Sequence, residues 1–176
     1  MSDPATAFIE KSRYYLQQEY LPKIERCVEK LSDEDLWWRP NDQSNSVGNL
    51  LLHLAGNVQQ WIVSGVGGAN DVRQRQQEFD ERERLPRRVL MERLRRVLDE
   101  MDQVFSSLDA SALLEPRQIQ GLEVSVLDAV YHVVEHFSMH VGQIIYLTKM
   151  RTGDDLGFYR VKEGDVVGTR WHEAGA

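Results

Sequence analysis

The sequence predicts an all-α fold, a four-helix bundle that forms a single domain over residues 1–176. Four long segments repeat apolar residues at every third or fourth position, which is the period of a helix with one buried face. No sustained strand pattern lies between these segments. The composition, 41% hydrophobic and 28% charged, is ordinary for a globular chain, so it argues against disordered and fibrous classes. The length suits one domain with its own core.

The first predicted helix covers residues 5–31, and we expect a kink near Pro22 because proline cannot donate a helical hydrogen bond. After an ordered loop, the second helix is expected to begin behind Ser46, a good N-cap. It should end at the glycines that begin with Gly65. Residues 69–84 are rich in Gln, Arg, Asp and Glu, so we expect a long surface connection between the second and third helices.

The third helix is expected over residues 85–107. Residues 117–125 alternate in polarity around a glycine and predict a small hairpin or an extended turn. The fourth helix has the clearest boundaries, because Ser125 with Asp128 makes a capping-box-like start and Gly153 a stop. Four apolar residues of the tail predict that it packs back on the bundle: Leu156, Phe158, Tyr159 and Trp171.

The overall charge is −7, from 21 basic and 28 acidic residues, so the chain has no general electrostatic attraction for nucleic acid. Residues 73–96 contain nine arginines and five acidic residues. We expect a solvated, ion-paired face there, with an anion-binding or nucleic-acid-binding patch as the alternative. Cys27 is the only cysteine, which excludes an intramolecular disulfide. Without a leader-like start or a long apolar run, we expect a cytoplasmic protein with no membrane partner.

Three of the five histidines, His132, His136 and His140, follow one another at four-residue intervals on the fourth helix, so neighbours share a face. Two adjacent imidazoles at this spacing are able to chelate one metal ion. His53 lies in the apolar stripe of the second helix and offers a third ligand, as facing helices do in bundles. Taken alone, His53 would be an ordinary buried histidine, but burying several unpartnered rings is costly, which favours a metal site.

Either pair on the fourth helix could supply the ligands. His132 and His136 with Glu135 match the H-x-x-E-H pattern of inverted zinc peptidases. However, Glu135 lies about 100° around the helix from His136, and no matching fold context is visible. His136 with His140 is the favoured pair, because the nearby Gly142 lets another helix approach closely.

Several motifs carry a resemblance to a known superfamily. Residues 46–57, SVGNLLLHLAGN, with the following Trp61, and residues 135–144, EHFSMHVGQI, resemble the DinB-like superfamily of four-helix metal-binding proteins. The loop at 37–40 and the connection at 71–79 resemble an uncharacterised branch of that superfamily. The resemblance covers nearly the whole chain.

The resemblance implies a divalent metal, zinc or nickel, held by His53, His136 and His140 in a bundle of up-down-down-up or similar order. His132 lies outside that ligand pattern, so it is expected to face a neighbouring helix or solvent. Three residues are candidates to support the ligands without binding the metal, with ordinary helix packing as the alternative: Asn57, Gln143 and His132.

The leading functional hypothesis is a metal-dependent enzyme of S-transferase or hydrolase type that acts on a small molecule. Three neutral imidazoles leave an open position for water or a thiolate. The resemblance adds a low-molecular-weight thiol as co-substrate and a homodimer as assembly. The catalytic residues, including a general base, are unknown from the sequence. The alternative is a non-catalytic, metal-stabilised homodimeric bundle with a structural or stress-related binding role.

Overall fold

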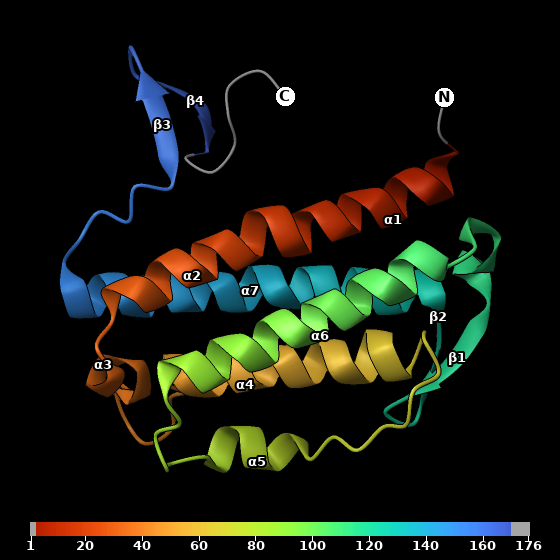
Figure 1. The fold of residues 1–176 in the computed structure, drawn as a ribbon, viewed down its shortest axis with the longest axis horizontal. Coiled ribbons are helices and arrows are strands. Elements are labelled where there is room, and N and C mark those ends of the chain that lie inside the picture. Colours follow the sequence, from red (N-terminus) through yellow and green to blue (C-terminus); the bar gives the residue numbers. More distant parts are fainter. Residues whose placement is uncertain (1–2, 170–176) are drawn as a thin grey trace.

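The computed structural model describes residues 3–169, in which four long helical segments lie side by side (Figure 1). The chain is predominantly helical, as the sequence predicts. No helix among these residues is both long and apolar enough to cross a bilayer. The four segments are α1 (Pro4–Tyr14) continued by a π-helical turn (Tyr15–Tyr20) and α2 (Leu21–Lys30); α4 (Val47–Val58) continued by a second π-helical turn (Gln59–Ser64); α6 (Arg87–Ser107); and α7 (Val126–Thr152).

The ends of these helices follow local sequence signals. At the start of α4, the Ser46 hydroxyl accepts a hydrogen bond from the backbone amide of Asn49. The side-chain carbonyl of Asn49 accepts one from the backbone amide of Ser46. Ser125 and Asp128 form the predicted capping box at the start of α7, and Gly153 ends that helix in the left-handed conformation, with φ of 69°. Pro22 lies two residues after the end of the first π-helical turn, and the amide of the intervening Leu21 donates to the carbonyl of Leu16.

Two small antiparallel sheets correct the all-α prediction. The first, β1 (Pro116–Ile119) with β2 (Leu122–Ser125), occupies the segment for which a hairpin was expected. The second, β3 (Tyr159–Lys162) with β4 (Asp165–Thr169), lies in the tail and was not predicted. Its two-residue turn places Glu163 and Gly164 at positive φ, as hairpin turns require, but only the glycine is a typical turn former.

The tail packs back on the helices as predicted, since Leu156 is fully buried and Phe158 is nearly so. Tyr159, by contrast, is 48% exposed, and Trp171 lies outside the described residues. Two further short helices, α3 (Asp33–Trp37) and α5 (Arg75–Asp80), precede α4 and follow it. The connection between α4 and α6 therefore carries a helix, and α5 lies against α4 (Figure 1).

Candidate metal centre

Three histidines from two helices meet where α4 contacts α7. His53 and His140 are buried, and His136 is half-buried. One ring nitrogen from each lies within 4.8 Å of the other two, and Nε2 of His136 is 2.8 Å from Nε2 of His53. The three side chains therefore lie close together, in an arrangement compatible with a metal site.

The two helices aim these rings for simple geometric reasons. On α4, His53 lies one turn from the buried Leu50 and one turn from the buried Asn57, so the face that packs in the core turns the imidazole inward. On α7, His136 and His140 are one turn apart, and their ring centroids are separated by 4.4 Å. His136 and His140, on adjacent turns of α7, thus both face His53 on α4.

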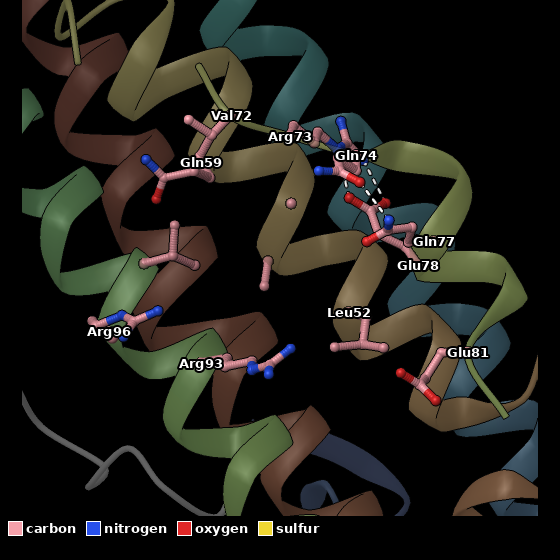
Figure 2. A pocket seen from close by; sticks show the side chains of 13 residues that line it. Leu52, Gln59, Val72, Arg73, Gln74, Gln77, Glu78, Glu81, Arg93 and Arg96 are labelled. Atoms are coloured by element: carbon pink, nitrogen blue, oxygen red, sulfur yellow. Dashed lines mark hydrogen bonds and ion pairs between the residues drawn. The ribbon is translucent and has the colours of Figure 1, made fainter. Parts of the chain in front are cut away.

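A carboxylate from the connection after α4 holds His53. Oε2 of Glu78 lies 2.9 Å from Nδ1 of His53. Arg73 donates to both oxygens of Glu78, from Nε at 2.7 Å and from Nη2 at 2.8 Å (Figure 2). Burial raises the pKa of the Glu78 carboxyl, but hydrogen bonds from Arg73 and His53 outweigh burial, so this pKa lies below its ordinary value. Glu78 is therefore ionised at neutral pH.

The ionised Glu78 fixes the tautomer of His53. A carboxylate only accepts hydrogen bonds, so Nδ1 of His53 carries a proton, and in the neutral tautomer the lone pair of Nε2 faces His136. The ring of Phe79 covers His53 at 4.7 Å between centroids. Gly56 gives the carboxylate its room, since a Cβ at this position would lie 2.0 Å from Oε1 of Glu78.

His140 shows the same arrangement with a neutral acceptor. Its Nδ1 lies 2.7 Å from Oε1 of Gln143, one turn further along α7. Its Nε2 is buried and has no hydrogen-bond partner among the described residues. A buried ring nitrogen without a partner is costly, so a metal ion bound at this atom would relieve that cost.

The rings of His136 and His140 are held neutral, as metal ligands must be. Burial, reinforced by the neighbouring His140 and His53, lowers the pKa of His136 to about 3. Burial likewise lowers the pKa of His140, although its hydrogen bond to Gln143 acts in the opposite direction. Neutral imidazole nitrogens suit zinc, nickel and similar divalent ions, so the residues present fit a metal of this class.

His132 takes part in a different cluster. The Asn57 side-chain amide lies 3.1 Å from Nε2 of His132, whose ring packs at a tilt against Trp61 with 4.0 Å between centroids. His132 also stacks on His136 at 5.2 Å, but within residues 3–169 it belongs to no group of converging ligand atoms. Glu135 is exposed, so the H-x-x-E-H alternative finds no arrangement of ligands and base here.

Of the three residues considered as supports, Gln143 contacts a histidine of the converging group through a hydrogen bond, to His140. Asn57 contacts His132 instead, and His132 faces α4 and the π-helical turn that continues it. Sequence reasoning missed Glu78 and Arg73, because the connection that contains them was expected to lie on the surface. The resembling motif at 71–79 includes both residues but gave them no role.

Comparison with known protein families gives a match over most of the chain. The family model described as "Protein of unknown function (DUF1572)" matches residues 3–165. No curated protein matches the chain.

Proposed function

We propose that this chain, which belongs to the DUF1572 family, binds one divalent metal ion through Nε2 of His53, His136 and His140 and acts as a metal-dependent enzyme on a small molecule. The observation that carries the proposal is the convergence of one ring nitrogen each from His53, His136 and His140 within 4.8 Å, together with a buried Nε2 of His140 that has no hydrogen-bond partner among the described residues. Zinc or nickel is the proposed metal. The proposal extends to membership of the DinB-like superfamily, with a single four-helix domain and a cytoplasmic location.

The bound metal would lower the pKa of a coordinated water or thiol and so supply a nucleophile near neutral pH. The chain's own residues would orient the ligands. Glu78 keeps the Nδ1 proton of His53, and Gln143 accepts the Nδ1 proton of His140, so both Nε2 lone pairs point to the site. We propose thiol transfer, with a low-molecular-weight thiol as co-substrate, or hydrolysis.

The test of catalysis is turnover by the metal-loaded protein. Wild-type protein loaded with zinc or nickel would be screened against thiol-dependent transfer and hydrolysis substrates, beside chelated wild-type protein and a His136→Ala variant. We expect turnover in the loaded wild type alone. Equal turnover in loaded and chelated wild-type protein would contradict a metal-dependent reaction.

A second candidate is a non-catalytic homodimer that the metal stabilises, in a structural or stress-related binding role. It draws support from an exposed apolar face of α7, on which Tyr131, Met139 and Tyr146 are 61%, 47% and 67% exposed. Gly142 lies on the same face with open space around the position of a Cβ, so a second copy of the helix could approach closely.

This alternative predicts that chelation lowers the melting temperature strongly and that the metal-loaded protein shows no turnover. Sedimentation would test the dimer separately. Met139→Glu and Tyr146→Glu should convert a dimer into a monomer, and a wild-type protein that sediments as a monomer at all concentrations would exclude this assembly.

A further inference from the structure

A pocket of about 360 Å³ lies between α4, α6 and the connection that precedes α6 (Figure 2). This volume is in the range of small-molecule sites. Leu52 and Ala55 of α4 and Val97 of α6 supply apolar lining. Arg73 and Glu78 line another side of the pocket, so the pocket lies next to the side chains that hold His53. None of the three histidines lines it.

Two arginines of α6 reach into this pocket. Arg93 and Arg96 are three residues apart, so they share one face of the helix, and Figure 2 shows both side chains on the α6 side of the opening. Arg93 has no hydrogen bond or ion pair within residues 3–169. Arg96 makes one long contact, 3.8 Å to Glu100. Both guanidinium groups are available to a ligand.

The acidic groups around the pocket are already engaged. Glu78 is held by Arg73, and Glu92, beside Arg93 on α6, by Arg88 at 2.7 Å. The Glu81 carboxylate accepts the Glu83 amide at 2.6 Å. Among the described residues that line the pocket, Glu81 is therefore the carboxylate without an ion pair, and it stands against the two arginines of α6.

We propose that this pocket binds a small molecule that carries a phosphate or carboxylate, with the anionic group on Arg93 and Arg96 and an apolar portion against Leu52, Ala55 and Val97. Guanidinium groups bind both oxyanions through paired hydrogen bonds. The side-chain amides of Gln59 and Gln77, which also line the pocket, supply further donors. This site revises the expectation for residues 73–96, because three of the nine arginines, Arg73, Arg93 and Arg96, line a pocket, while Arg88 and Arg95 form ion pairs outside it.

Calorimetric titration of the full chain with phenyl phosphate and with benzoate tests the proposal and separates the two oxyanions. We expect saturable binding of at least one probe. The double variant Arg93→Gln/Arg96→Gln should weaken it about tenfold or more, because charge-assisted hydrogen bonds are lost. The matched control, Arg84→Gln/Arg95→Gln, removes the same charge at two positions that do not line the pocket and leaves the Arg88–Glu92 pair intact, so it should bind as wild type does.

The three-histidine site is an alternative location for an oxyanion, so a His136→Ala variant is titrated in parallel. It should keep its affinity for the probe, and this outcome is independent of whether the proposed enzyme is active. The proposal is overturned if neither probe binds, if both double variants lose affinity equally, or if His136→Ala abolishes binding.

Discussion

His132 and His140 each lie one turn from His136 on α7, yet their surroundings differ. Nε2 of His140 is buried and unpartnered beside His53 and His136. Nε2 of His132 is 3.1 Å from the Asn57 amide, and its ring lies on Trp61. Both rings experience burial that lowers their pKa, so protonation does not distinguish them.

The difference lies in which ring nitrogen the protein occupies. Gln143 takes Nδ1 of His140 and leaves Nε2 free, whereas Asn57 occupies Nε2 of His132. Glu78 accepts a hydrogen bond from Nδ1 of His53, just as Gln143 accepts one from Nδ1 of His140. Identical spacing along a helix therefore produces one histidine suited to a metal and one suited to packing, and the partners of each ring decide between these roles.

The largest effect expected from these supports is that of Glu78→Gln. The neutral amide is a weaker acceptor for the Nδ1 proton of His53, so metal affinity should fall about 10- to 100-fold. Competition with a chromogenic chelator measures this affinity. Glu81→Gln, which removes a nearby carboxylate without touching His53, is the control. Equal affinities for wild type and Glu78→Gln would show that the carboxylate does not support the metal.

Gly56→Ala should disrupt the same hydrogen bond, between Glu78 and His53, without changing either of these residues. The added Cβ would meet Oε1 of Glu78 and displace the carboxylate from His53, so metal affinity should fall about as far as in Glu78→Gln or somewhat less. The free energy of unfolding of the metal-free protein should not fall comparably, since alanine is favoured over glycine in a helix by about 1 kcal/mol. Calorimetry of metal-free protein beside chelator competition separates the two quantities. Parallel loss of both would point to general misfolding.

Gln143→Leu should have a smaller effect, because a neutral acceptor contributes less than a charged one. We expect metal affinity to fall about fivefold. Gln143→Glu restores an acceptor for Nδ1 of His140 and should recover wild-type affinity or exceed it. Failure of the glutamate to recover what the leucine loses would mean that Gln143 acts through packing.

His132→Ala should leave metal affinity unchanged. It removes the packing against Trp61 and the partner of the Asn57 amide, so the free energy of unfolding should fall by about 1 kcal/mol or more. Thermal melts and chelator competition on one preparation give both values. A tenfold loss of metal affinity would place His132 among the ligands and remove the distinction from His140.

The features that follow from local signals were predictable from sequence. The Ser125 cap and the Gly153 stop of α7 each depend on a few neighbouring residues, and so does the closeness of His136 to His140. Glu78 was missed because it is 25 positions from His53 and meets it only once the connection folds across α4. Likewise, β3 and β4 pair through a turn whose Glu163 is not a typical residue at positive φ.

The most direct test of the central claim is metal content, measured by plasma mass spectrometry on untagged protein purified without chelators. Wild type is compared with His53→Ala, His136→Ala, His140→Ala and His132→Ala, with circular dichroism to verify that each variant is folded. We predict near-stoichiometric metal in wild type and His132→Ala, and its loss in the other three. Wild-type protein that holds no metal even after reconstitution, or equal retention by all four variants, would contradict the three-histidine metal centre.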